Sequence, residues 1–279
     1  MKVITNIPQM QKISFALKKK GKKIGVVPTM GYLHEGHLSL IRIAQKYSDI
    51  VILTLFINPT QFAAHEDLNR YPQDIPGDLK KCKKAGVDYV FSPKISKMYP
   101  KNFETYVETT QISLPLCGGS RPGHFRGVTT IVSKLFLITQ PTVAVLGKKD
   151  FQQLAVIKRM GADLNFPIRI IGAPIVRDKD GLALSSRNVY LTLEERKNAV
   201  GISSALFWIR NQIKSGETRI AILMSHLKNK LFSCGLRLDY AECLHSENLT
   251  PLTHYQKGKT LFAVACFVGK TRLIDNIVV

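Results

Sequence analysis

The sequence lacks any long apolar run. None of its stretches approaches the roughly 20 apolar residues that a membrane-spanning helix requires, and the longest largely apolar block, residues 51–57, has the length of a strand. Residues 1–20 contain no apolar core followed by a small-residue cleavage site, so we expect no signal peptide. These absences predict a cytoplasmic protein without a membrane segment.

Cysteine is scarce too. The 279 residues include five cysteines, an odd number, and no two of them have the C-x-x-C spacing. Disulfide frameworks need an even number of cysteines, and zinc ribbons need closely spaced pairs. We therefore expect reduced thiols and a fold that depends on its apolar core.

Acidic residues are few relative to basic ones, 20 against 40, which gives a net charge of +20. Such an excess suits nucleic acid, an anionic membrane surface or anionic small substrates. The two densest lysine clusters, 18–23 and 80–84, lie at the ends of predicted helices, where lysine interacts favourably with the helix dipole. Neither cluster is interleaved with the aromatic residues that single-strand binders use for stacking. We therefore favour a basic solvated surface over a nucleic-acid footprint.

The first part of the chain alternates predicted strands with predicted helices. Strands are expected at 22–28, 50–57, 89–91, 142–146 and 168–171, and helices at 36–47, 74–85, 127–139 and 150–164. The run at 50–57 is too continuously apolar for a half-exposed strand and is typical of a buried parallel sheet. Repeated strand–helix–strand units predict an α/β fold, a Rossmann-like parallel sheet with helices on both faces.

The remainder of the chain follows a different pattern. Helices are expected at 192–215 and at about 219–232, followed by strands at 236–244 and 260–268. Helices followed by antiparallel strands indicate a smaller α+β domain. We therefore predict a Rossmann-like domain at 1–175 and a C-terminal α+β domain at 176–279.

The segment at 28–37, PTMGYLHEGH, follows the first predicted strand and opens a helix. Ligands of parallel sheets bind at the carboxyl ends of the strands, and the free N–H groups of a helix start attract phosphate. His34 and His37 are three residues apart, so they share one face of the helix start. Gly36 leaves room between them. Two imidazoles there can donate hydrogen bonds to a triphosphate without the fixed charge of lysine.

Three other interpretations of this segment compete. A zinc protease motif needs histidines at i and i+4 and a third ligand, whereas the spacing here is i, i+3. A dinucleotide fingerprint needs G-x-G-x-x-G, which Gly31 and Gly36 do not match. Two histidines can also simply cap an ordinary helix, but the strand–loop–helix context makes this interpretation weaker.

Four further polar segments follow strands or precede helices. Asn58–Phe62 offers two amides, which suit hydroxyl and carbonyl oxygens. Arg121–Gly127 can position an anion or cap a helix. Gly147–Gln153 begins a helix, where phosphate is favoured and Asp150 can be the N-cap. Gly181–Asn188 combines hydroxyls with one guanidinium, and these groups can clamp a polyphosphate.

Together these segments closely resemble the pantoate–β-alanine ligase family. The resemblance runs along nearly the whole chain, through VPTMGYLHEGH, FINPTQF, RYP, RPGHFRGVTTIVSKLF, KKDFQQL, DGLALSSRN and RLIDN. The H-x-G-H element alone is similar to the wider nucleotidyltransferase superfamily, in which LSSRN occupies the position of a KMSKS-type loop. The resemblance implies an AMP-forming ligase that condenses pantoate with β-alanine through a pantoyl adenylate, releasing AMP and pyrophosphate.

The resemblance also implies the site, position by position. It places pantoate binding, like nucleotide binding, in the domain at 1–175, and it gives the C-terminal domain the LSSRN loop. The implied ATP-binding residues are Met30, Gly31, Tyr32, Leu33, His34, Glu35, Gly36, His37, Gly147, Lys148, Lys149, Asp150, Val176, Leu184, Ser185, Ser186 and Arg187. The implied catalytic residues are His37, His34, Lys149 and Arg187. The implied pantoate and β-alanine residues are Gln61, Gln153, Asn58 and Tyr71.

The expected partners are ATP, pantoate, β-alanine and a second copy of the chain as a homodimer, with no membrane and no nucleic acid. The resemblance further implies Mg²⁺, and one acidic position associated with it falls at Asp78. Its neighbour, Gly77, is not acidic, so we expect the ion to rest mainly on phosphates and water. A second departure is Lys148, where the family usually has glutamate.

Two other functions remain open on the sequence alone. A nucleotidylyltransferase of the same superfamily would share the histidines and the serine loop but would not need amides at both Gln61 and Gln153. A basic nucleic-acid-binding protein with a degenerate nucleotide fold would show salt-sensitive binding to RNA or DNA and form no adenylate. Pantoate-dependent exchange of labelled pyrophosphate into ATP separates these functions.

Overall fold

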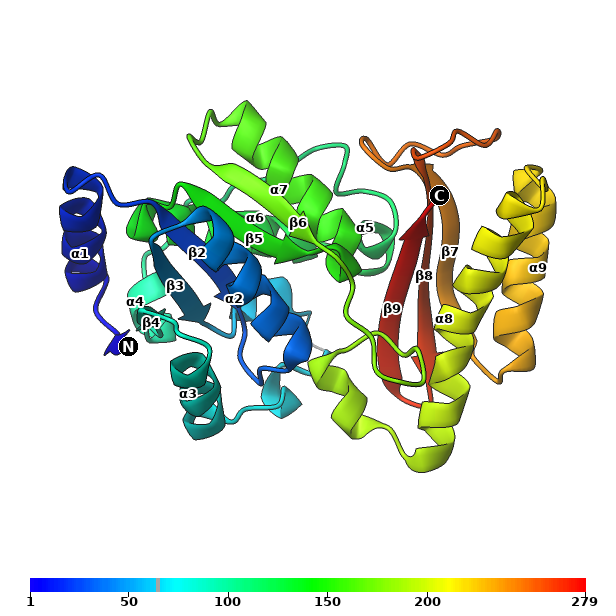
Figure 1. Cartoon of the computed structure of the whole chain (residues 1–279), viewed down its shortest axis with the longest axis horizontal. Coiled ribbons are helices and arrows are strands. Elements are labelled where there is room, and N and C mark those ends of the chain that lie inside the picture. The colour runs from blue at the N-terminus through cyan, green and yellow to red at the C-terminus, as the bar shows by residue number, and fades with distance from the viewer. Residues whose placement is uncertain (64–65) are drawn as a thin grey trace.

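A six-stranded parallel sheet occupies the middle of the first part of the chain (Figure 1). The computed structural model describes residues 1–63 and 66–279. The strands are β1 (Lys2–Ile4), β2 (Ile24–Thr29), β3 (Ile50–Leu55), β4 (Tyr89–Phe91), β5 (Val143–Gly147) and β6 (Arg169–Ala173), in the order β1-β4-β3-β2-β5-β6. From β2 the sheet continues through β3, β4 and β1 on one side, whereas β5 and β6 lie on the other side of β2. The direction of winding therefore reverses between β2 and β5, and ligands of such sheets bind at the carboxyl ends beside that point.

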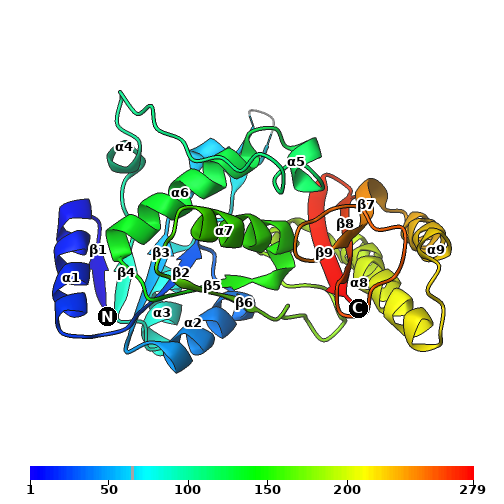
Figure 2. The same cartoon turned by 90° about the horizontal axis from the view of Figure 1, so that it is seen from above.

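Helices cover both faces of this sheet. Figure 2 shows α6 and α7 on one side and α2 and α3 on the other. The helices are α1 (Ile7–Lys19), α2 (Glu35–Tyr47), α3 (Ile75–Lys84), α4 (Ile95–Met98), α5 (Cys117–Ser120), α6 (His124–Thr139) and α7 (Phe151–Asp163). Alternate strand residues face the two layers: Val26 packs in the cluster that contains α6, and Val27 packs in the cluster that contains α2. The predicted α/β fold class is confirmed.

The C-terminal part is a three-stranded antiparallel sheet with two helices packed against it (Figure 1). Its elements are α8 (Leu193–Lys214), α9 (Ile220–Ser233), β7 (Arg237–His245), β8 (Thr260–Val268) and β9 (Thr271–Val278). The apolar cluster of the parallel sheet continues into this part through Leu244, Leu261 and Ala263. The two parts are thus joined by buried surface, and the division at 175 and 176 stays a prediction.

Most predicted elements are present with bounds shifted by one to three residues. The sequence did not predict β1, β9 or the short helices α4 and α5, and it indicated α1 only by the lysine cluster at its end, without bounds. β1 has only three residues, too short for a periodic signal. β9 contains the charged residues Arg272 and Asp275, and aspartate is disfavoured in strands. Asp239 and Arg177 form ion pairs with them in the folded chain, so the strand depends on contacts that a local pattern does not contain.

Two smaller expectations are also tested. The five cysteines are free thiols, as expected. None of the helices that the structure describes combines the length and the apolarity needed to cross a membrane.

Candidate active site

The loop after β2 turns sharply before it enters α2. Gly31 and Tyr32 both have positive φ, +94° and +52°, and this brings the chain back over the carboxyl end of the sheet. His34 is the N-cap of α2, and His37 lies one turn later, with the two ring centroids 4.1 Å apart. A Cβ atom at position 36 would lie 2.8 Å from the His34 ring. Glycine is therefore required there by His34 itself.

Backbone hydrogen bonds define the tautomers of both histidines. The His34 backbone N–H donates to Nδ1 of His37 at 3.2 Å, and the Gly36 N–H donates to Nδ1 of His34 at 3.1 Å. An Nδ1 atom that accepts a hydrogen bond carries no proton, so the neutral ring holds its proton on Nε2. Each imidazole thus has one N–H donor left for a ligand.

Burial keeps both rings neutral. It lowers the pKa of His34 to about 4, with a further contribution from the positive charge of Lys149. Burial also lowers the pKa of His37 well below its ordinary value, helped by His34 and Lys149. At neutral pH the pair can therefore donate hydrogen bonds without adding charge.

The lowered pKa of His34 predicts a pH dependence of stability. The unfolded histidine takes up a proton near pH 6.5, whereas the folded one stays neutral down to about pH 4. Acid therefore favours the unfolded state in this window, and the free energy of unfolding falls as the pH drops from 7 to 5. Chemical denaturation at both pH values measures it. His34→Asn keeps an N-cap acceptor but does not titrate, so its decrease should be smaller; an equal decrease would contradict the assignment.

Asp78 holds the same loop from behind. Its two carboxylate oxygens accept hydrogen bonds from the backbone N–H groups of Tyr32 and Leu33, each at 2.7 Å. Lys81, one turn later on α3, donates to the Leu33 carbonyl oxygen at 2.7 Å. Asp78 is only 1% exposed. Its carboxylate therefore stabilises the positive φ of Tyr32.

These contacts do not fit the predicted role of Asp78 as a ligand of Mg²⁺. Both of its oxygens accept hydrogen bonds from backbone amides, and Asp78 does not line the cavity of about 210 Å³ that His34 and His37 line. Within 1–63 and 66–279, no cluster of three or more histidine, cysteine, aspartate or glutamate residues could hold a metal ion.

Asp78→Asn separates the two roles. Loss of one acceptor should loosen the loop and lower kcat several-fold, because a buried N–H group is left without a partner. The Mg²⁺ concentration that gives half-maximal activity should not change. Asp74→Asn is the matched control, since Asp74 caps α3 but does not reach the loop. A large rise in the Mg²⁺ requirement of Asp78→Asn alone would support the metal role instead.

The amide side of the site follows β3. Asn58 is 1% exposed, and its Nδ2 donates to Oε1 of Gln61 at 3.0 Å and to the Gly127 carbonyl at 3.1 Å. Its Oδ1 accepts from the Tyr99 hydroxyl at 2.7 Å. The Asn58 amide is thus occupied within the protein and orients Gln61. A Cβ at position 127 would lie 2.4 Å from the Thr60 carbonyl oxygen, so glycine lets α6 approach this segment.

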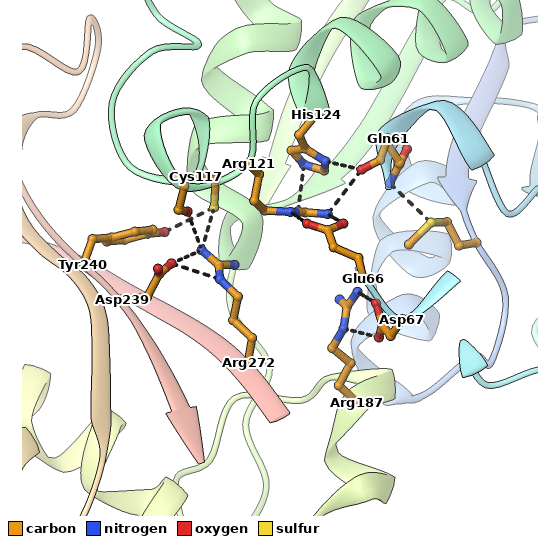
Figure 3. A network of polar contacts seen from close by, with 12 residues as sticks. Gln61, Glu66, Asp67, Cys117, Arg121, His124, Arg187, Asp239, Tyr240 and Arg272 are labelled. Atoms are coloured by element: carbon orange, nitrogen blue, oxygen red, sulfur yellow. Dashed lines mark hydrogen bonds and ion pairs between the residues drawn. The ribbon is translucent and has the colours of Figure 1, made fainter. Parts of the chain in front are cut away.

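The RPGHFRG segment also supports Gln61. His124 Nδ1 and Arg121 Nη2 both contact the Gln61 carbonyl oxygen, at 2.8 and 3.2 Å. Arg121 is held in turn by Glu66 through Nε and Nη2, at 2.6 and 2.7 Å (Figure 3). The sequence left open anion positioning or helix capping for this segment, and the contacts show a third role, a brace of the Gln61 loop.

The serine–arginine loop, η4 (Ser186–Tyr190), reaches the histidine loop from the C-terminal part. Ser186 Oγ donates to the Tyr32 carbonyl oxygen at 3.3 Å. Arg187 forms a bidentate ion pair with Asp67, with both N···O distances 2.8 Å (Figure 3). The loop therefore lies against the parallel-sheet part across the site.

Two residues of β9 hold the remaining loops. Asn276 Nδ2 donates to the carbonyl oxygens of Lys148 and Lys149, each at 2.9 Å. Asp275 forms a bidentate ion pair with Arg177, which flanks the serine–arginine loop. Asp150 is the N-cap of α7, as expected, but its side chain makes no capping hydrogen bond; it lies 4.0 Å from Lys149 Nζ.

One cavity of about 210 Å³ brings these groups together. The expected site residues that line it are Met30, His34, Gly36, His37, Asn58, Gln61, Tyr71, Gly147, Lys149, Asp150, Gln153, Val176, Leu184, Ser185, Ser186 and Arg187. The expected residues that do not line it are Gly31, Tyr32, Leu33, Glu35, Lys148 and Asp78. Sequence reasoning missed its apolar wall, made of Phe56, Leu40, Leu146 and the α6 residues Val128, Ile131, Val132 and Leu135. An apolar stripe at helical spacing fits plain core packing equally well, so the sequence alone does not distinguish these α6 residues as part of a site.

Comparison with known proteins agrees with this geometry. The family model described as pantoate-beta-alanine ligase matches residues 2–278. This chain belongs to the pantoate–β-alanine ligase family. The pantothenate synthetase of Sulfurihydrogenibium sp. is 50% identical, covering 99% of each chain, and that of Thermoanaerobacter sp. is 52% identical, covering 98% of this chain and 95% of the relative.

Solved structures show the same relationship. Pantothenate synthetase from Thermus thermophilus matches with a TM-score of 0.94 at 40% identity, covering 99% of each chain. Pantoate-beta-alanine ligase from Francisella tularensis, solved with beta-gamma ATP and beta-alanine, matches with a TM-score of 0.84 at 36% identity, covering 100% of this chain and 97% of that one. The resemblance inferred from the motifs is confirmed, and this member of the ligase family is an enzyme.

Proposed function

We propose that this ligase condenses pantoate with β-alanine at the expense of ATP, through a pantoyl adenylate formed in the 210 Å³ cavity. One observation supports the proposal most directly. One cavity is lined by two sets of groups: the two neutral imidazoles with Lys149 and the serine–arginine loop, and the amides of Gln61 and Gln153. Donors suited to phosphate and amides suited to a small hydroxy acid thus face one space.

The chemistry needs activation of a carboxylate. A carboxylate is a poor acyl donor to an amine, so the pantoate carboxylate attacks the α-phosphorus of ATP and pyrophosphate leaves. The amine of β-alanine then attacks the acyl carbon of the adenylate, and AMP leaves. No protein nucleophile is required, so alignment and charge stabilisation account for the catalysis.

Each residue of the cavity receives a role from its chemistry. Lys149 and Arg187 stabilise the negative charge that develops on the phosphates. His34 and His37 donate from Nε2 and hold the phosphate oxygens in place. Ser185 and Ser186 orient the phosphates from the facing loop.

The amides would hold the second substrate. Gln61 and Gln153 aim pantoate by its hydroxyl and carboxylate, and the apolar wall on α6 suits its methyl groups. The serine–arginine loop covers this space, which keeps water from the adenylate.

The decisive experiment is exchange of labelled pyrophosphate into ATP. Exchange should require pantoate and should not require β-alanine, because the adenylate forms before the amine is used. Exchange without pantoate would favour a nucleotidylyltransferase, and absence of exchange together with salt-sensitive binding of RNA or DNA would favour a nucleic-acid-binding protein.

Lys149→Ala tests the phosphate side. Removing a charge that meets the developing negative charge should lower kcat about tenfold to a thousandfold. Lys158→Ala is the control, because Lys158 is exposed on α7, on the outside of the molecule. Near-wild-type turnover of Lys149→Ala, with the fold intact by circular dichroism, would refute the role.

Three further expectations from the sequence stay predictions. Mg²⁺ would rest on the phosphates and water, since the described residues offer no cluster to hold it. A homodimer is expected, and sedimentation measures it. The cytoplasm is the expected compartment.

A further inference from the structure

Arg187 is fixed by a carboxylate from a distant segment. Its Nε and Nη2 atoms donate to the two oxygens of Asp67, each at 2.8 Å (Figure 3). The side chains are 28% and 19% exposed, so this pair is better shielded from solvent than a surface pair. The two residues are 120 positions apart in the chain, and Asp67 belongs to the parallel-sheet part.

The same segment receives the rest of the serine–arginine loop. The Tyr190 hydroxyl donates to the Arg70 carbonyl oxygen at 2.5 Å. The Arg187 guanidinium lies 5.5 Å from the centre of the Tyr71 ring. Residues 67–71 thus form a seat for the loop, and Asp67 makes the charged contact in it.

The geometry of the pair leaves one edge of Arg187 available. A guanidinium has five N–H donors, and Asp67 engages it from the side, through Nε and Nη2. Nη1 donates to none of the residues at 1–63 and 66–279. Arg187 also lines the cavity of His34 and Lys149 while it is paired. The pair therefore need not break for Nη1 to meet a phosphate.

In the neighbouring pair, Arg121 and Glu66, all three guanidinium nitrogens of the arginine contact protein groups. Glu66 engages Arg121 in the same side-on manner, but Arg121 Nη1 contacts His124 at 3.1 Å and Nη2 also reaches the Gln61 carbonyl. Arg121 therefore has its guanidinium nitrogens engaged within the protein. Of these two arginines, only Arg187 has an Nη1 atom without an acceptor among the described residues.

We propose that Asp67 is a positioning residue for ATP binding: it holds the Arg187 guanidinium so that its Nη1 edge faces the triphosphate before the nucleotide arrives. This inference rests on the proposed function, in which Arg187 binds the phosphates. A guanidinium already held in place loses less conformational freedom on binding. Although burial alone lowers the pKa of Arg187, its hydrogen bonds with Asp67 raise it above the ordinary value, so the group is charged at every working pH.

Other roles of Asp67 predict other effects of its substitution on ATP affinity. If Asp67 competed with the phosphates for Arg187, removing its charge would tighten ATP binding. If Asp67 only stabilised the fold, its removal would lower the melting temperature without any specific connection to Arg187. A double-mutant cycle separates the three cases. When one residue acts through another, the effects of their substitutions on the binding free energy do not add.

The experiment measures the Kd of α,β-methylene ATP by calorimetry for four full-length proteins: the wild type, Asp67→Asn, Arg187→Ala and the double variant. We expect Asp67→Asn to weaken binding about tenfold in the wild-type background and no more than about twofold in the Arg187→Ala background, since Asp67 acts through Arg187. Asp163→Asn is the control, because it removes an exposed ion pair with Arg159 on α7 and should leave Kd unchanged. If Asp67→Asn fails to fold, Asp67→Glu keeps the charge and displaces it, and its loss of affinity should again require Arg187.

Each outcome bears on one statement. Unchanged binding in Arg187→Ala overturns the phosphate role of Arg187, and with it this part of the proposed function. Weaker binding in Arg187→Ala but unchanged binding in Asp67→Asn overturns the positioning role alone. Tighter binding in Asp67→Asn shows competition, and equal weakening in both backgrounds shows an effect independent of Arg187; either overturns the inference.

Discussion

Two backbone N–H groups that donate to imidazole Nδ1 atoms are the constraint on which this site depends. They select the Nε2–H tautomer of His34 and His37, and burial prevents protonation at neutral pH. The site can therefore place two hydrogen-bond donors beside a highly charged nucleotide while the formal charge comes from Lys149 and Arg187. A protonated pair would instead repel Lys149.

The geometry of the site is maintained by residues that lie outside it. Asp78 holds the backbone ahead of His34, Arg121 and His124 hold the Gln61 loop, and Asn276 holds the backbone of Lys149. Each contact joins a short loop at the carboxyl ends of the strands to a different element. Loops bind ligands well only when a rigid scaffold positions them, and here buried hydrogen bonds provide that rigidity. The C-terminal sheet is part of this scaffold through β9.

The contiguous parts of the site could be predicted from the sequence, whereas the contacts between them could not. His34 and His37 are close in the chain, and a strand followed by a helix gives them their place. Asp67 and Asn276 act across more than a hundred residues, and ion pairs or amide contacts at such separation leave no periodic signal in a single sequence. Asp78 shows the same limit: the family resemblance associates it with Mg²⁺, whereas its oxygens accept hydrogen bonds from the backbone amides of Tyr32 and Leu33, more than 40 residues away. In the fold, the long apolar run that includes β3 predicted the sheet. β9 was not predicted, because charged residues interrupt its apolar pattern.

The most direct test of this account is a crystal structure of the full chain with α,β-methylene ATP and pantoate. The triphosphate should contact Nε2 of His34 and His37, Lys149 and Arg187 within the 210 Å³ cavity, and pantoate should lie against Gln61 and Gln153. A triphosphate seated instead in the larger cavity of about 840 Å³ between the two parts of the chain, beside Arg272 and Tyr240 and away from both imidazoles, would contradict it.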